Sequence, residues 1–149
     1  GEEQLIHSVC APDFDAAIER FADALADELR PACMKSCVAD TDPDTPVLDA
    51  DCDVVHESAV TGTRATVLEC EVDPSGALTP PTDETICYAL RHDAEGLTAS
   101  PLDDMSPECV EQGWNLEFEI VFTEPLPLGS SISPTCVLSD LVQRDCPNL

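Results

Sequence analysis

The strongest periodic pattern of apolar residues in the chain lies in the segment 10–37. Its apolar positions recur at helical spacing on one narrow face: Phe14, Ile18, Phe21, Leu25 and Leu29. Asp13 can cap the N-terminus of such a helix, and Pro31 disfavours helical geometry at Arg30. The pattern therefore predicts one amphipathic N-terminal helix whose apolar face packs on a core.

The rest of the chain favours strands, because apolar and polar residues alternate in several short runs. The predicted strands cover 52–57, 64–72, 86–91, 115–123 and 131–138. The most regular run has Glu117 and Glu119 on its outward face and four apolar residues on its inward face: Leu116, Phe118, Ile120 and Phe122. Pro134 has no backbone N–H, so the last strand should lie at a sheet edge or contain a bulge.

The order of these elements predicts an α+β fold. No helical pattern separates one predicted strand from the next, which favours antiparallel neighbours. We expect the N-terminal helix to pack on a mainly antiparallel sheet of four to five short strands. With 149 residues the chain can form a single domain with a hydrophobic core. The expected parts of that domain are a lead-in, a helix segment, a strand-rich body and a tail: 1–9, 10–37, 52–138 and 139–149.

The charge balance restricts the possible partners. The chain has 31 Asp and Glu against 6 Lys and Arg, which gives a formal net charge of -25. Nucleic acid and anionic membranes are poor partners, because either one requires a basic surface. Basic proteins, cations or a saline medium suit this charge better. There is neither a long apolar run nor a charged-then-apolar leader, so we expect no membrane span and no signal peptide in this sequence.

The cysteines predict an oxidising compartment. Nine of them are spread over nearly the whole chain: Cys10, Cys33, Cys37, Cys52, Cys70, Cys87, Cys109, Cys136 and Cys146. Such spacing is typical of disulfide frameworks in secreted or cell-surface proteins. We expect about four disulfides, among them Cys33–Cys52 and Cys70–Cys87, and we expect Cys109 to anchor the long loop 93–113.

The odd number of cysteines leaves one of them free, or paired through an intermolecular disulfide with a protein partner or another copy of the chain. The pair in CMKSC, residues 33–37, could suggest a redox or zinc site. Separate bridges to distant cysteines explain this pair better, since redox motifs favour CxxC and zinc would need two more nearby ligands.

The acidic loop, residues 38–51, contains the most specific candidate site. Its carboxylates resemble a calcium loop of the DxDxD type: Asp40, Asp42, Asp44, Asp49 and Asp51. The loop departs from that pattern, because Thr45 replaces the turn glycine and Pro46 stands where a backbone carbonyl should bind the ion. Asp51 also replaces the bidentate glutamate. The alternative to calcium binding is therefore a solvated acidic loop without a ligand.

The sequence contains no recognisable catalytic motif. GxSxG and GxxxxGK[ST] are both absent, and the three histidines, His7, His56 and His92, are isolated from one another. Each histidine could be a general base, but an ordinary surface or strand residue explains it more simply. We therefore predict that the protein is not an enzyme, with a secreted hydrolase whose site the sequence does not reveal as an alternative.

One stretch resembles a known family. The sequence LIHSVCAPDFDAAIERFADALADELRPACM, together with the later isolated cysteines, resembles the cysteine-bearing region that follows the von Willebrand factor A domain in secreted or lipid-anchored proteins of myxobacteria and their relatives. The similarity extends over about residues 5–137. Asp104 and Ser106 do not supply the DxSxS adhesion motif of the upstream domain, so no functional residue is carried over.

This resemblance implies a cell-surface or secreted accessory module that is part of a larger product. The function expected from the sequence is a secreted, non-enzymatic structural, adhesion or assembly module within a larger surface protein or extracellular assembly. A calcium-dependent binding module that uses residues 40–51 is the first alternative, and the hydrolase is the second.

Overall fold

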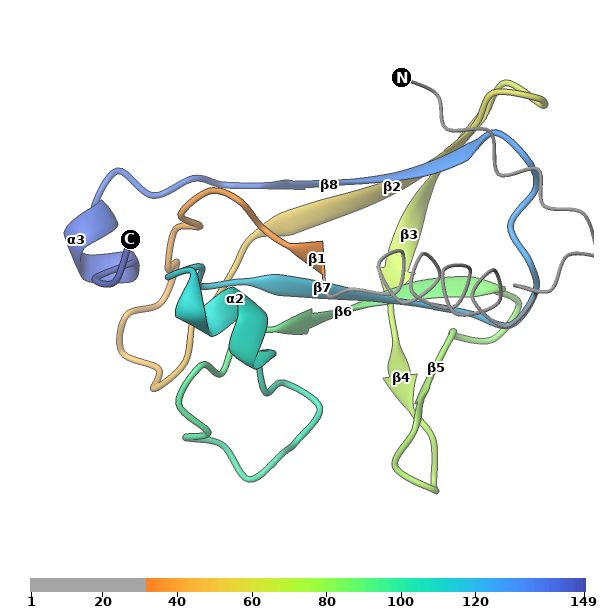
Figure 1. Cartoon of the computed structure of the whole chain (residues 1–149). Coiled ribbons are helices and arrows are strands. Elements are labelled where there is room, and N and C mark those ends of the chain that lie inside the picture. The colour runs from red at the N-terminus through yellow and green to blue at the C-terminus, as the bar shows by residue number, and fades with distance from the viewer. Residues whose placement is uncertain (1–31) are drawn as a thin grey trace, which may run out of the picture. The chain divides into compact units, whose positions relative to one another are not determined.

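A computed structural model describes residues 32–149 and shows mainly β-structure (Figure 1). The larger sheet has six strands in the order β1-β7-β6-β3-β2-β8, and β4 and β5 form a separate hairpin. The strands are β1 (Ala32–Cys33), β2 (Cys52–Ser58), β3 (Thr63–Glu69), β4 (Glu71–Val72), β5 (Leu78–Thr79), β6 (Ile86–Arg91), β7 (Glu117–Phe122) and β8 (Ser130–Cys136). The described helices are short: α2 (Pro107–Glu111) and α3 (Val142–Asp145).

This architecture corrects the predicted α+β class, because residues 32–149 are mainly β-structure and their two helices, α2 and α3, have only five and four residues. The sheet is also mixed, since β3 and β6 run parallel, with Leu68 opposite Cys87 and Glu69 opposite Tyr88. Its other strand pairs are antiparallel. The α+β class rested on the helix expected before Pro31, which lies outside the described residues. The described residues belong to one compact unit, 31–149, so the single domain over 1–149 stays a prediction.

The five predicted strands are all present; β6 has the predicted ends, and the ends of the other four are shifted. The predicted run 64–72 is divided at Cys70, where β3 ends and the β4–β5 hairpin begins. The pattern missed β1 and β5, which have two residues each and are too short to show a period. Pro134 lies in β8 at the edge of the sheet, as its missing N–H predicted.

The assignment of faces in β7 is partly wrong. Leu116 and Phe118 are buried as expected, but Glu117 is also buried, with only 4% of its surface exposed. Its Oε2 accepts a hydrogen bond from the backbone N–H of Ser106 at 2.7 Å. The loop before α2 therefore covers the face of the sheet that was expected to meet solvent, whereas Phe122, at the strand end, is 53% exposed.

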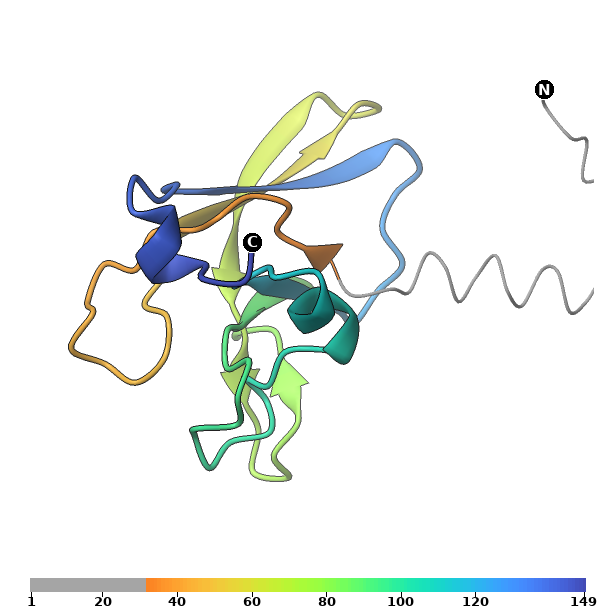
Figure 2. The same ribbon diagram turned by 60° about the vertical axis from the view of Figure 1, so that its left-hand side comes forward.

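The large sheet is curled, so that the segment after edge strand β1 contacts the segment after edge strand β8. Val38, which follows β1, forms an isolated antiparallel bridge with Leu138, which follows β8, and the two segments lie side by side in both views (Figure 1 and Figure 2). The Asn115 side chain fixes this junction by bonding both the N–H and the C=O of Val38. The curl encloses the main core cluster: Val38, Val54, Val67, Ile86, Tyr88, Leu116 and Phe118.

Four disulfides join segments that are distant in the sequence. They are Cys33–Cys109, Cys37–Cys146, Cys52–Cys136 and Cys70–Cys87. The expected number of bridges and the Cys70–Cys87 pair are confirmed, and Cys109 anchors its loop to β1.

The predicted Cys33–Cys52 pair is wrong. Antiparallel pairing of β2 with β8 places Cys52 directly opposite Cys136. The eight cysteines of residues 32–149 are bonded to one another, and Cys10 lies outside the described part of the chain. The expected intermolecular disulfide through a ninth cysteine therefore stays a prediction. No helix within residues 32–149 has the length and apolar character to cross a membrane.

Candidate binding cleft

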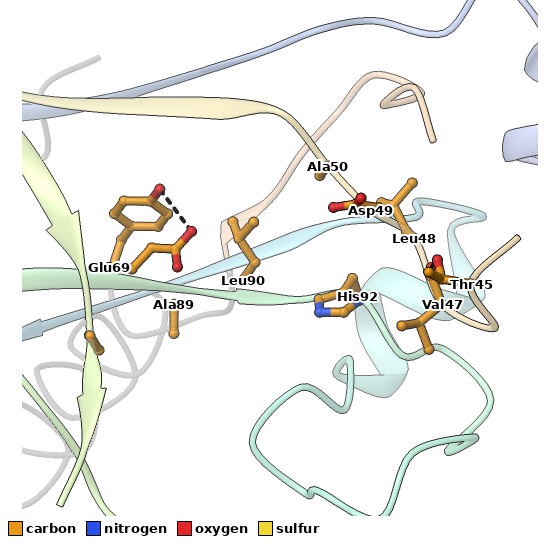
Figure 3. A pocket seen from close by; sticks show the side chains of 11 residues that line it. Thr45, Val47, Leu48, Asp49, Ala50, Glu69, Ala89, Leu90 and His92 are labelled. Carbon is orange, nitrogen blue, oxygen red and sulfur yellow. Dashed lines mark hydrogen bonds between the residues drawn. The ribbon is translucent and has the colours of Figure 1, made fainter. Parts of the chain in front are cut away.

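A cavity of about 510 Å³ lies between the acidic loop and β6 (Figure 3). Residues 45–50 form one wall, and the ends of β3 and β6 form the other. Figure 3 shows Glu69 toward one end of the cleft, Leu90 near its middle and His92 toward the other end. The acidic loop connects β1, at one edge of the sheet, with β2, and β6 and β3 are the two central strands of that sheet.

The lining of the cleft combines apolar side chains with two carboxylates. The half-buried apolar residues come from both walls: Val47, Leu48, Ala50, Ala89 and Leu90. Asp49 and Glu69 are exposed and acidic, and none of the lining residues is Lys or Arg. The cleft can therefore hold a group that has an apolar body and a positive charge.

Tyr88 gives one of these carboxylates a defined position. Its hydroxyl donates a hydrogen bond to Glu69 Oε1 at 3.4 Å, shown dashed in Figure 3. The parallel register of β3 and β6 places the two residues opposite each other. Burial of the phenol raises the pKa of Tyr88, and the adjacent Glu69 charge raises it further, so Tyr88 remains a donor at neutral pH.

The acidic loop uses two of its five predicted calcium ligands, Asp40 and Asp42, in hydrogen bonds to its own backbone. The N–H of Thr41 donates to the carbonyl of Asp49 at 2.8 Å and closes the loop. The Asp40 Oδ1 accepts from the N–H groups of Asp42 and Asp49 at 3.2 and 3.1 Å. The Asp42 Oδ1 accepts from the N–H of Asp44. Such Asx turns stabilise a tight loop without any ion.

The five predicted ligands do not form a compact metal site in this structure. Among residues 32–149, the three acidic side chains with ligand atoms within 4.8 Å of one another are Asp93, Asp103 and Asp104. Asp49 lines the cleft, and Asp51 lies just before β2. The calcium site at residues 40–51 stays a prediction.

Nothing in the sequence pattern indicates the group Asp93, Asp103 and Asp104, because these residues lie in a segment that the pattern predicts only as a loop. The parallel bridge between Asp93 and Asp104 brings the two ends of that loop together. Asp93 is 2% exposed and accepts hydrogen bonds from the N–H groups of Thr98 and Glu95, which lower its pKa. Asp103 accepts from the Thr98 hydroxyl. Carboxylate oxygens are suitable ligands for hard divalent cations. Here, however, the Asp93 and Asp103 carboxylates already accept hydrogen bonds from residues of the loop.

The histidines do not form an apparent catalytic group. His92 lines the cleft, His56 lies in β2, and His7 is outside the described residues. One ring nitrogen each of His56 and His92 is buried without a hydrogen-bond partner. No hydrogen bond within residues 32–149 joins either imidazole to a carboxylate. The absence of enzymatic activity stays a prediction.

Asp145 connects the acidic loop to α3. Its carboxylate accepts hydrogen bonds from the Arg144 guanidinium, the Ser139 hydroxyl and the N–H of Asp40. The bond from Arg144 is the main reason why the pKa of Asp145 lies below its ordinary value, and the Ser139 hydroxyl lowers it further. Arg144 also donates to the carbonyl of Asp40 at 3.2 Å. These bonds hold the loop that forms one wall of the cleft.

Comparison with family models, curated proteins and solved structures finds no match for this chain. The resemblance to the region that follows the von Willebrand factor A domain in myxobacterial proteins therefore stays a prediction.

Proposed function

We propose that this protein is a secreted or cell-surface module without enzymatic activity that serves structure, adhesion or assembly by binding another protein. The observation that carries the proposal is the bonding of all eight described cysteines in four bridges, since such frameworks are typical of oxidising, extracellular compartments. A cleft that is accessible and lacks a paired catalytic group supports a binding role. The charge of -25 favours a basic partner over nucleic acid or an anionic membrane.

Cell fractionation combined with thiol labelling tests the compartment. We expect the protein in the medium or at the cell surface, with the eight cysteines of residues 32–149 protected from alkylation until a reductant is added. Intact mass with and without reductant then counts the bridges. A cytosolic protein whose thiols react without reduction would contradict the proposal.

Calcium binding by residues 40–51 is the alternative function. The closure of the loop supports this alternative. The Thr41 N–H bonds the Asp49 carbonyl and the Asp49 N–H bonds Asp40 Oδ1, so Asp40 and Asp49 lie close together. A bound ion would stabilise the folded state by roughly 2.7 kcal/mol at a hundredfold excess over its Kd.

Thermal unfolding with calcium and with chelator tests this alternative. Calcium should raise the Tm of the unaltered protein and have little effect on Asp42→Asn. Asp103→Asn is the matched control, because it changes the other acidic group. Equal Tm values with calcium and chelator would exclude the alternative, and loss of the shift only in Asp103→Asn would reassign the ion.

A further inference from the structure

We propose that the cleft between residues 45–50 and β6 binds a basic segment of a partner protein. A Lys or Arg side chain would lie along the apolar floor, with its charged end at Glu69 or Asp49. This inference rests on the proposed function, because it names the kind of partner that such a binding module would take.

The chemistry of the cleft matches the two parts of a long basic side chain. Lysine and arginine have an apolar stem and a charged end, and they commonly bury the stem while the charge remains at the surface. Leu48 and Leu90 supply apolar contacts, whereas the Glu69 carboxylate lies toward one end of the cleft (Figure 3). A cavity of about 510 Å³ has the size of ordinary ligand sites.

No basic residue within 32–149 neutralises the negative charge of the cleft. Residues 32–149 contain four basic residues, and three of them pair with carboxylates elsewhere: Arg64 with Glu57, Arg91 with Glu119, and Arg144 with Asp145. Neither these three nor Lys35 line the cleft. Uncompensated carboxylates beside an apolar surface attract a cationic partner, and the excess negative charge of the chain would speed its approach.

Glu69 is held in place before any partner arrives. Tyr88, its hydrogen-bond donor, is 7% exposed and packs against Phe118 with ring centroids 6.3 Å apart. A fixed donor reduces the freedom that an exposed glutamate would otherwise lose on binding. The net charge disfavours a second copy of this chain as the occupant, because two chains of charge -25 repel each other.

Fluorescence polarisation with a short labelled peptide of alternating leucine and lysine tests the inference at an ionic strength of ~0.15 M. Glu69→Gln should weaken binding by about fivefold. Glu71→Gln is the matched control, because Glu71 is exposed, carries the same charge and lies outside the cleft. Asp49→Asn should likewise weaken binding more than Asp44→Asn does.

Tyr88→Phe separates position from charge, because it removes the hydroxyl that orients Glu69 and leaves the net charge unchanged. The Tyr88→Phe variant should bind the peptide more weakly. If only the charge of Glu69 mattered, its affinity would be unchanged. NMR shift changes on adding the peptide should centre on residues 45–50 and 88–92. Equal losses in Glu69→Gln and Glu71→Gln, or shifts spread over the whole surface, would overturn the inference. Cell fractionation tests the extracellular location, and peptide binding tests the cleft. The two proposals can therefore fail independently.

Discussion

Replacing Cys37 and Cys146 together by alanine should lower the free energy of unfolding by about 5 kcal/mol. This bridge joins residues 109 apart in the sequence, the widest separation of the four bridges, and a bridge considered by itself restricts the unfolded chain more when it closes a longer loop. It also releases the C-terminal segment from the residues next to Val38, where the curled sheet is joined. The loss is comparable to the whole stability of many domains.

The double alanine variant of Cys70 and Cys87 is the matched control. That bridge spans 17 residues, and its removal should cost about 3 kcal/mol. Urea unfolding followed by circular dichroism compares the two variants, and changing both cysteines of a pair prevents mispairing. An equal or reversed order would contradict this assignment of bridges or the chain-entropy explanation.

Asp145→Asn should lower the free energy of unfolding by about 2 kcal/mol at neutral pH. The side chain of Asp145 is 2% exposed and connects Arg144, Ser139 and the backbone of Asp40. An amide has the same shape, but it carries no charge for the guanidinium and has one acceptor oxygen instead of two. Asp140→Asn, at an exposed position in the same segment, should change stability little.

The effect of Asp145 should depend on pH with a definite sign. The pKa of Asp145 in the folded protein lies below its ordinary value of 3.8, chiefly because Arg144 bonds the ionised form. Folding therefore disfavours protonation of this group, and its contribution to stability is complete above about pH 5. It is lost as the pH falls through the lowered pKa. Urea titrations should show the difference from Asp145→Asn shrinking in acid, and a constant difference would contradict this account.

The residues of the cleft could not be predicted from the sequence. Asp49 belongs to a DxDxD-like pattern that predicts a calcium ligand. It lines the cleft because of the path that the whole acidic loop follows. Glu69 and Tyr88 each belong to a predicted strand, but their contact depends on the parallel pairing of β3 with β6. Alternation along one strand carries no information about which strand lies beside it.

The sequence by itself determined the local features of this protein. Period-two alternation located the runs that form β2, β3, β6, β7 and β8, because burial of one sheet face requires an apolar residue at every second position. The missing N–H of Pro134 restricted its strand to a sheet edge or a bulge, and β8 is an edge strand. Cysteine spacing predicted the number of bridges that residues 32–149 contain.

Only the tertiary structure decided how these parts combine. It paired Cys33 with Cys109 instead of Cys52, buried Glu117 under the loop before α2, and brought Asp93 to Asp104. Each outcome depends on contacts between residues that are not neighbours in the sequence, with a separation of 76 for the disulfide and of 11 for Ser106 and Glu117, and residue periodicity reports only the nearest neighbours. The mixed character of the sheet depends on the same kind of contact, since the parallel pairing of β3 with β6 has no local signal in the sequence.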